Sequence, residues 1–530
     1  MPETATPKPL DRGTVVTLMA MGVAVFVIAN DFTALSVALP RIEHDLDADV
    51  DTVQWVINAY ALVFGVLIVT GGRLADLFGR RRMFFAGCAI FASFSVLAGL
   101  AQDTGWLLAC RAAMGIGAAM MWPAILGMTY AALPEEKAGL AGGLILGAAG
   151  LGNAMGPLIG GALTDALSWR AVFFLNLPVS LVAIYIIWLK VHQPEERAPD
   201  AAIDYGGVAT LSTGLVALLL ALDQATDYGW GDWRIVSLLA ASGILLAAFV
   251  AVERRMGGRA LVPPDVIANR EFSAVCLAVL LMSAVFFACL LYLPQFMQKL
   301  MGYSPLAAGA GLLPMMALFA LVSFAAGPLY QRLGAKAVVS MGASCLFAGM
   351  LLLSLVGRGS GYGGLVPGMA VVGLGVGLFY SSVTTAGVTA LDPSRSSLAG
   401  GIVYMFQIAG GAIGLGLTTT VFTSAAHSAL VDSVRTTGVG PVPAPQLDAV
   451  HGILAGTESA RRALAQFGPQ AVDRVMDLVR DAFVTGFQAA FRVDTALALG
   501  GLAITVAFVG GRLGARRPAP AHGAGAGERP

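Results

Sequence analysis

The sequence GGRLADLFGRRR, residues 71–82, directly follows a long apolar run and returns in altered form as AGPLYQRLGAK, residues 326–336. A second pair, LAGG at 140–143 and LAGG at 398–401, lies at nearly the same spacing. The matched positions are Gly72, Leu74, Gly79 and Arg81 with Gly327, Leu329, Gly334 and Lys336, and Gly152 and Gly156 with Gly410 and Gly414. Two matches at nearly one offset predict that the chain contains two homologous halves.

The composition of the chain indicates that lipid is its main solvent. Apolar residues make up 57% of the 530 positions, charged residues make up 12%, and the mean hydropathy is +0.78. A soluble protein carries roughly a quarter of its residues as charges, so this chain cannot cover a water-facing surface. The net charge is zero, which argues against nucleic acid as a partner.

The apolar runs predict the number of membrane crossings, because a spanning helix needs roughly 20 apolar residues. Fourteen runs have this character: 14–40, 53–72, 83–101, 106–133, 139–164, 171–190, 205–222, 235–252, 272–293, 306–327, 337–356, 363–386, 398–424 and 483–511. We therefore expect an all-α integral membrane protein, with six helices in each homologous half and an inserted pair between the halves. Many secondary transporters use such repeats to build a central site that opens alternately to each side.

Lysine and arginine are distributed unequally between the two sets of loops that these helices create. One set, together with both termini, holds twenty of the 32 basic residues, whereas the short loops of the other set hold Arg41, Arg170, Arg234, Lys299 and Arg358. Because cytoplasmic loops are enriched in Lys and Arg, both termini are predicted to be cytoplasmic. We expect a multi-pass protein of a bacterial-type plasma membrane.

The runs also divide the chain into six segments. In chain order they are a cytoplasmic tail (1–13), a first six-helix bundle (14–190), a cytoplasmic linker (191–204), the inserted pair (205–252), a second six-helix bundle (272–511) and a disordered cytoplasmic tail (512–530). The second bundle includes a long outer segment, residues 425–482. Apolar residues at helical spacing within Glu458–Arg480 predict a helix there, which we expect to rest on the bundle or lipid as a solvated cap.

Five stretches of the chain are similar to signatures of one transporter family. They are NDFTALSVALP (30–40), GGRLADLFGRRR (71–82), RAAMGIGAAMMWPA (111–124), GLILGAAGLGNAMGPLIGG (143–161) and SWRAVFFLNLP (168–178). In this order, and across almost the whole chain, they resemble the major facilitator superfamily, specifically its fourteen-helix drug:proton antiporter branch. The resemblance implies the fold of that superfamily and a proton-coupled exporter that works by alternating access.

Asp31 and Arg111 are the clearest charges within the expected membrane helices. An ionised carboxylate in the bilayer is costly and usually faces a cavity or a partner, and burial favours its protonated form. Guanidinium stays protonated, so Arg111 can only modulate a nearby carboxylate or hold a water path. The resemblance implies that both residues act in proton coupling. The alternatives are a partly hydrated Asp31 near the outer mouth and an Arg111 bonded to carbonyl groups or lying near the interface.

Other polar residues lie within or near the runs, and the sequence favours no role for them. Arg492 and Asp494 are expected to lie near the interface or to compensate each other locally, and Asp223 is expected to be a loop residue.

A polar turn after the second apolar run contains Gly72, Arg73, Asp76, Gly79 and Arg80. A tight turn explains the glycines, and Asp76 is suited to a helix N-terminus. The resemblance implies that this turn clamps the two halves together in one state and releases them in another. Gln331 stands at the position of Asp76 in the second half, which predicts a lopsided clamp. Simple positive-inside anchoring is the alternative, although it does not account for Asp76.

Gly152, Gly156 and Gly160 recur every fourth residue on one face of the helix expected at 139–164. Such a face lets a neighbouring backbone approach closely, and Pro157 after Gly156 is expected to weaken or kink the helix. We expect this stretch to bend during the transport cycle. Close packing alone is the alternative.

No nucleotide loop, metal cluster or catalytic constellation stands out in the sequence, so we expect neither a cofactor nor an enzymatic activity. An ion gradient is then the expected energy source. The expected partners are protons, membrane lipid and a small, lipophilic, cationic substrate, and the chain is expected to act as a monomer. The alternatives are a dedicated exporter of one metabolite, antibiotic or lipid, and a non-transporting membrane sensor or scaffold.

Overall fold

Helices dominate the structure because a chain in lipid must satisfy its backbone hydrogen bonds internally. The computed structural model describes residues 11–48, 50–190, 203–436 and 469–510. Within these ranges, fourteen helices are long and apolar enough to cross a membrane, which confirms the expected number. They are α1 (Arg12–Asp45), α2 (Val50–Phe78), α3 (Arg80–Gly99), α4 (Thr104–Ala131), α5 (Ala138–Ala166), α6 (Arg170–Lys190), α7 (Tyr205–Tyr228), α8 (Trp233–Met256), α10 (Arg270–Met301), α12 (Leu313–Leu333), α13 (Ala335–Ser354), α14 (Tyr362–Thr389), α15 (Ser396–Thr436) and α18 (Pro469–Phe508). The short helices α9 (Pro264–Ala268) and α11 (Pro305–Gly311) lie between them.

The two six-helix halves share one packing pattern, as the repeat predicts. In the first half α1 packs on α5 and α2 on α4, and in the second half their counterparts pair in the same way, α10 with α15 and α12 with α14. A Cβ atom at Gly152 would lie 2.6 Å from Phe26 O on α1, and one at Gly410 would lie 2.2 Å from Leu280 O on α10. The matched glycines therefore make equivalent close contacts in both halves.

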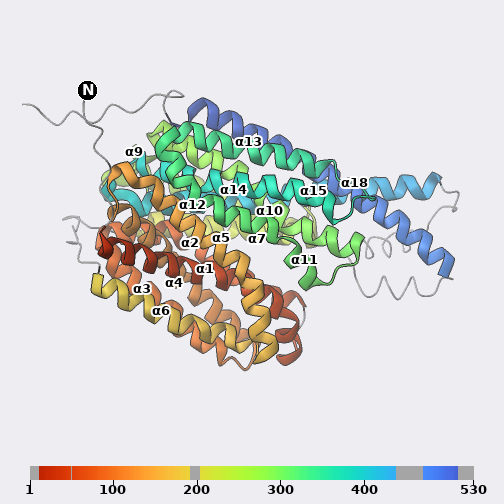
Figure 1. Ribbon diagram of the computed structural model, residues 1–530, viewed down its shortest axis with the longest axis horizontal. Coiled ribbons are helices and arrows are strands. Elements are labelled where there is room, and N and C mark those ends of the chain that lie inside the picture. Colours follow the sequence, from red (N-terminus) through yellow and green to blue (C-terminus); the bar gives the residue numbers. More distant parts are fainter. Residues whose placement is uncertain (1–10, 49, 191–202, 437–468, 511–530) are drawn as a thin grey trace, which may run out of the picture.

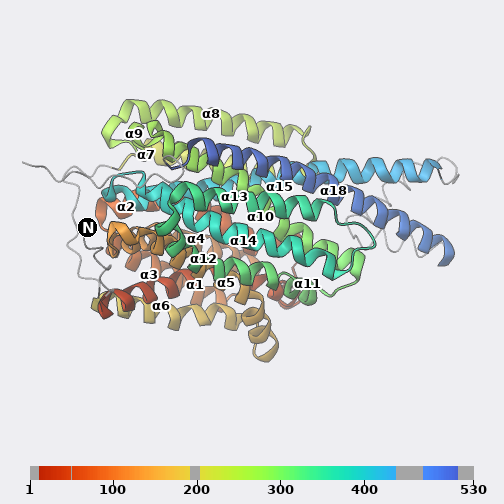
Figure 2. The same ribbon diagram turned by 45° about the horizontal axis from the view of Figure 1, so that its top comes forward.

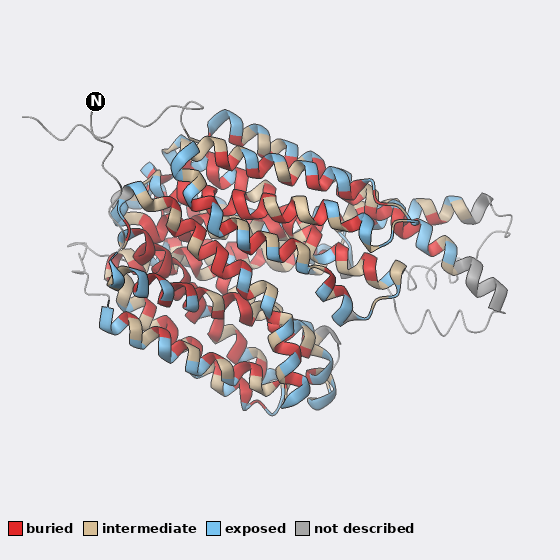
Figure 3. Ribbon diagram, in the orientation of Figure 1, coloured by how far each residue is buried: buried red, intermediate tan, exposed pale blue. Residues whose placement is uncertain are grey.

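The halves meet along their inner helices, and the buried residues concentrate there and inside each half (Figures 1 and 3). From the first half, α5 packs on α12 and α14, while α2 and α4 pack on α15. These crossings bring α2, α4 and α5 of the first half against α12, α14 and α15 of the second half.

The inserted pair lies at the outside of the bundle (Figure 2). Helix α7 packs on α2 and on α15, so it touches both halves, whereas α8 packs mainly on α7. Asn58 Nδ2 of α2 donates to Asp223 Oδ1 at 3.3 Å, and Trp230 Nε1 donates to Thr420 Oγ1 of α15 at 2.6 Å. The expectation that Asp223 is a loop residue is wrong, because α7 continues to Tyr228.

The outer segment expected at 425–482 begins and ends in helix. Helix α15 runs to Thr436 and α18 starts at Pro469, so both extend past the apolar runs and project from the bundle (Figure 1). Leu430 packs with Val479 and Ala482, and Arg358 pairs with Asp477 and Asp481. These contacts hold residues 469–482 as a continuation of α18 instead of a cap lying on the bundle.

Several expected features lie outside the described residues. They are residues 1–10 of the first tail, residues 191–202 of the linker, residues 458–468 of the predicted outer helix and the tail 512–530.

Candidate functional site

Asp31 and Arg111, which are 80 positions apart in the chain, form an ion pair inside the first half. Arg111 Nη1 of α4 donates to Asp31 Oδ2 of α1 at 2.6 Å, and neither side chain has any exposed surface. The structure therefore does not fit the alternative of a partly hydrated Asp31 at the outer mouth. Removing one partner of such a pair leaves an unpaired buried charge, which typically costs about 3–5 kcal/mol.

Arg111 is held by helix α2 as well as by Asp31. Its Nε donates to Val56 O at 2.7 Å, and its guanidinium lies 4.4 Å from the centre of the Tyr60 ring. Its Nη2 has no hydrogen-bond partner among the described residues. The guanidinium is thus fixed in place, and its Nη2 group is left able to donate to another partner when Asp31 changes its charge.

Asn176 completes the surroundings of Asp31, although no role for it was predicted from the sequence. Asn176 Nδ2 of α6 donates to Asp31 Oδ1 at 2.9 Å and also lies 3.0 Å from Ser95 Oγ of α3. A signal was present, because Asn176 interrupts the otherwise apolar stretch AVFFLNLP, residues 171–178. Both carboxylate oxygens of Asp31 therefore accept hydrogen bonds, and five helices of the first half meet at this site.

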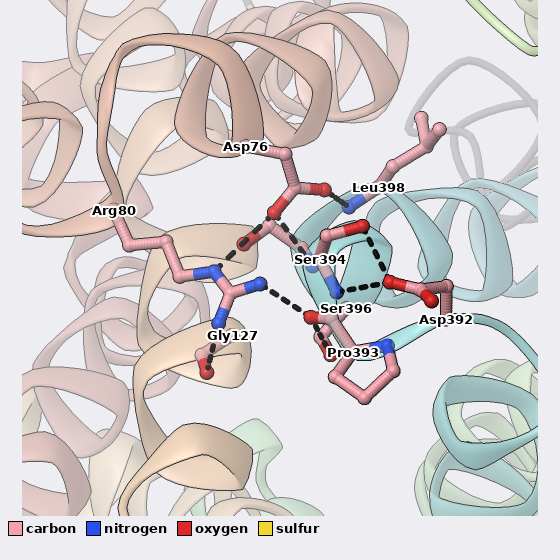
Figure 4. Close-up of polar contacts among 9 residues, drawn as sticks. Asp76, Arg80, Gly127, Asp392, Pro393, Ser394, Ser396 and Leu398 are labelled. Carbon is pink, nitrogen blue, oxygen red and sulfur yellow. Dashed lines mark hydrogen bonds and ion pairs between the residues drawn. The ribbon is translucent and has the colours of Figure 1, made fainter. Parts of the chain in front are cut away.

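The polar segment at 72–80, expected to be a turn, is the last part of α2 and the start of α3, with the turn confined to Gly79. It forms a connection between the two halves, which we call the clamp (Figure 4). Asp76 Oδ2 accepts a hydrogen bond from Leu398 N at 2.8 Å, and Asp76 Oδ1 accepts one from Ser397 N at 3.3 Å. Ser397 and Leu398 lie in the first turn of α15, so the carboxylate caps a helix of the opposite half. Free N–H groups and the positive end of the helix dipole favour a carboxylate there.

Arg80 extends the clamp. Its Nε donates to Asp76 Oδ1 at 3.3 Å, its Nη1 to Gly127 O at 3.0 Å and its Nη2 to Pro393 O of the second half at 2.7 Å. Arg73 is half-buried, and its Nε has no partner among the described residues. The structure thus brings Asp76 and Arg80 together across the halves, and it leaves Arg73 outside these hydrogen bonds.

Two positions of the clamp require glycine, each for a different structural reason. Gly72 faces α15 so closely that a Cβ atom would lie 2.7 Å from Ser397 O. Gly79 has φ 103°, which strains any residue with a side chain. The first glycine permits the contact between the halves, and the second permits the sharp turn from α2 into α3.

Gly152, Gly156 and Gly160 of α5 all face α1. A Cβ atom at Gly160 would lie 2.1 Å from Ala34 O, and one at Gly156 would meet Thr33. Helix α5 continues through Pro157 without interruption. Close packing accounts for this glycine face in the present conformation, and bending at Pro157 stays a prediction.

A small cavity lies between the halves and is lined by aromatic, aliphatic and uncharged polar side chains. The first half contributes Trp122, Leu126 and Leu146, and the second half contributes Thr384, Gly400, Val403, Tyr404 and Gln407. The Trp122 and Tyr404 ring centres lie 4.5 Å apart, and Phe64 lies 5.3 Å from Tyr404. An apolar, aromatic lining with a few polar groups has the composition of small-molecule sites, but in the present conformation this cavity is too small to hold a drug-sized molecule.

Comparison with known proteins identifies the family to which the chain belongs. A family model of the Major Facilitator Superfamily matches residues 21–415. The chain is 34% identical to the puromycin resistance protein pur8 of Streptomyces alboniger, over 82% of this chain and 86% of that protein. It is 30% identical to the multidrug resistance protein Stp of Mycobacterium tuberculosis, over 92% and 90% of the two chains.

A solved structure shares the fold. The human organic anion transporter MFSD10 (TETRAN) superposes with a TM-score of 0.61 at 14% identity, covering 93% of this chain and 99% of that chain. Together with the family match and the fourteen helices, this shows that the chain is a multi-pass membrane transporter that belongs to the Major Facilitator Superfamily, in its fourteen-helix drug:proton antiporter branch.

Proposed function

We propose that this chain is a proton-coupled exporter of flat, lipophilic, cationic drugs or related small molecules, and that it works by alternating access. The observation that carries the proposal is the buried Asp31–Arg111 pair in the first half. A carboxylate inside a membrane bundle is costly and marks an ion or proton pathway by default.

Asp31 is the proton carrier in this mechanism. While it is ionised, Arg111 neutralises it and Asn176 donates to its other oxygen. A proton on Asp31 removes the negative charge but leaves the guanidinium charged. The electrostatic attraction that holds α1 against α4 is then lost. Protonation would therefore favour a rearrangement of α1 against α4 and α6.

The clamp links this event to the two halves. In the present conformation Asp76 and Arg80 hold the halves closed at the end of the bundle where α1 begins. We expect this end to face the cytoplasm, because most basic residues of the chain belong to it or to its loops. Export then requires the clamp to open inward for loading and to close again before release.

The substrate class follows from the cavity between the halves. Trp122 and Tyr404 line the cavity with aromatic rings, and such rings attract flat rings and cations through stacking and cation–π contacts. Leu126, Leu146 and Val403 supply apolar surface. Such a lining imposes few fixed hydrogen bonds, which suits a range of lipophilic compounds.

The proton gradient supplies enough energy for such export. One charge that crosses about 100 mV gains roughly 2.3 kcal/mol, and this corresponds to about a fifty-fold concentration ratio.

Ethidium efflux from proteoliposomes under an imposed pH gradient tests the proposal. Asp31→Asn is expected to abolish gradient-driven efflux while dye exchange without a gradient persists, because the variant can no longer bind and release a proton. Asp165→Asn, which alters an exposed carboxylate on α5, is the matched control and should transport normally. Undiminished gradient-driven efflux by Asp31→Asn would refute the role of Asp31, and wild-type efflux that ignores the gradient would refute proton coupling.

A dedicated exporter of one antibiotic or metabolite is the second candidate. It is favoured by the name of the relative from Streptomyces alboniger, a puromycin resistance protein. A panel of lipophilic cations and of antibiotics, puromycin among them, in the same assay separates the two. Export of a single compound from the panel would support the dedicated exporter.

A further inference from the structure

Asp494 is a fully buried carboxyl group in the second half, and it has no role in the mechanism proposed above. It lies in α18 and has no exposed surface. Thr418 Oγ1 of α15 donates to Asp494 Oδ1 at 2.9 Å, whereas Oδ2 has no partner among the described residues. Arg492 is exposed and forms no ion pair with Asp494 among the described residues, so the expectation that the two compensate each other locally is wrong.

The helices packed against α18 at this point are α10, α13 and α15. Cys289 and Tyr292 of α10 are the titratable groups that lie near Asp494. Cys289 Sγ lies 3.4 Å from Met350 Sδ of α13, and Tyr292 donates to Thr419 Oγ1 at 2.8 Å. The other titratable residues on the described parts of these four helices are Arg270, Glu271, Cys276, Lys299, Lys336, Cys345, Tyr404, His427, Asp432, Asp477, Arg480, Asp481 and Arg492.

Within the described part of the chain, Asp494 makes no ion pair with any of these residues. An ionised carboxylate without water, counter-charge or a full set of hydrogen bonds is strongly disfavoured in a protein interior or a membrane. Asp31 differs because Arg111 and Asn176 satisfy its charged form. The surroundings of Asp494 therefore select the neutral acid, and those of Asp31 allow the anion.

Helix α15 connects Asp494 to the rest of the machinery. Its first turn is capped by Asp76 in the clamp, its next turns carry Tyr404 of the cavity, and Thr418 lies further along the same helix. A change at Asp494 would alter the hydrogen bond to Thr418 and so act on a helix that closes the clamp and lines the cavity.

We propose that Asp494 is a second proton-binding site of this transporter, holding a proton at Oδ2 in the present conformation and exchanging it with water when the second half rearranges. In that exchange the O–H bond breaks, its electron pair stays on the carboxylate, and the proton passes to water. This inference rests on the proposed proton-coupled export. It adds to that mechanism a second proton carrier, which lies in the half opposite to Asp31.

Two measurements on the purified full-length chain test the proposal. The first is the infrared spectrum across a pH titration in light and heavy water, which identifies the carbonyl band of protonated carboxyl groups. The second is the number of protons released when ethidium is added to protein in weakly buffered solution. The variants are Asp494→Asn, Asp494→Glu and, as an exposed control, Asp165→Asn.

Asp494→Asn is expected to remove one protonated-carboxyl band and to lower the proton release by one proton, while ethidium still binds. Asp494→Glu is expected to restore both signals, and Asp165→Asn to leave both unchanged. A band that persists in Asp494→Asn, or a band that is lost without any change in proton release, would overturn the proposal, the latter because Asp494 would then be a permanently neutral structural acid.

Failure of this inference and failure of the proposed function give different results. If proton-coupled export itself is wrong, wild-type efflux ignores the pH gradient and Asp31→Asn has no effect on it. If only the second site is wrong, wild-type efflux follows the gradient and Asp31→Asn abolishes it, while Asp494→Asn matches the wild type in proton release.

Discussion

The two crossings between the halves, α2 on α15 and α12 on α5, share their glycine contacts but differ in their charges. A Cβ atom at Gly72 would lie 2.7 Å from Ser397 O, and one at Gly327 would lie 2.8 Å from Gly139 O. At the first crossing Asp76 caps α15. At the second, Gln331 takes the place of Asp76 and is exposed, and the residue before α5, Lys137, makes no side-chain cap.

This difference separates close glycine contacts, which both crossings share, from the charged hydrogen bonds of one crossing, which we propose act as a latch. The glycines allow helices of opposite halves to touch through their backbones, and the repeat preserves them because both crossings need that closeness. The carboxylate and Arg80, whose counterpart is Ala335, add charge-assisted hydrogen bonds to one crossing. The clamp is therefore one-sided, and we expect its loss to affect the balance between conformations more than any change at the other crossing.

The largest expected effect comes from Asp76→Ala. The change removes two hydrogen bonds to the first turn of α15 and the partner of Arg80, and hydrogen bonds to charged groups contribute about 1.5–3 kcal/mol each. We expect conformations that are open at the clamp to gain at least tenfold in population. Spin labels at Arg82 and Arg332, exposed positions in opposite halves, should report a longer distance between the halves.

Asp392→Asn is the matched control for that measurement, because Asp392 lies beside the clamp and hydrogen-bonds within its own turn to Ser394. Its label distances should match those of the unaltered chain. An Asp76→Ala protein with the same distance distribution as this control would mean that the carboxylate does not hold the halves together.

A smaller effect, equal at both crossings, is expected from Gly72→Ala and Gly327→Ala. Each added methyl group meets backbone of the opposite half, and overpacking of this kind costs about 1–3 kcal/mol. The same label pair should show partial opening in both variants. A strong response at Gly72 with none at Gly327 would show that the two contacts are not equivalent, despite their matched geometry.

The smallest effect is expected from Gln331→Asp, which places a carboxylate at the second crossing in the position that Asp76 occupies at the first. An acidic group near a helix N-terminus contributes about 0.3–1 kcal/mol when exposed. We expect a slight shift toward the closed clamp and a modest slowing of ethidium efflux. Gln331→Glu, whose longer side chain fits the first turn of α5 less well, should do less, and an equal effect would point to a general charge effect.

Much of the fold could be predicted from the sequence because its signals are local. The number of spans follows from apolar runs of sufficient length, and the two halves follow from matched glycines such as Gly72 with Gly327. The ends of α15 and α18 were harder to predict, because residues beyond the apolar runs are held in helix by contacts such as Leu430 with Val479 and Arg358 with Asp481. Those contacts join parts of the chain that are far apart in sequence.

The candidate site shows the same limit. Asp31 and Arg111 could be selected one by one, since each is an ionisable group within an apolar run. Their pairing, and the part of Asn176 in it, depend on three helices that meet only in the folded bundle. Asp494 looked like a partner of Arg492 because the two are neighbours in sequence, yet helical geometry turns them to different faces.

The sequence by itself determined that the chain is an integral membrane protein and that it contains two homologous halves. It also showed which polar residues interrupt the apolar runs. These properties depend on composition and spacing alone. Only the tertiary structure decided which charges are neutralised. Asp31 lies against Arg111, Asp76 lies against the first turn of α15, and Asp494 lies against Thr418, with no counter-charge among the described residues. The reason is that an ionisable group in a low-dielectric interior is governed by the few atoms within hydrogen-bond reach, and the packing of distant helices chooses those atoms.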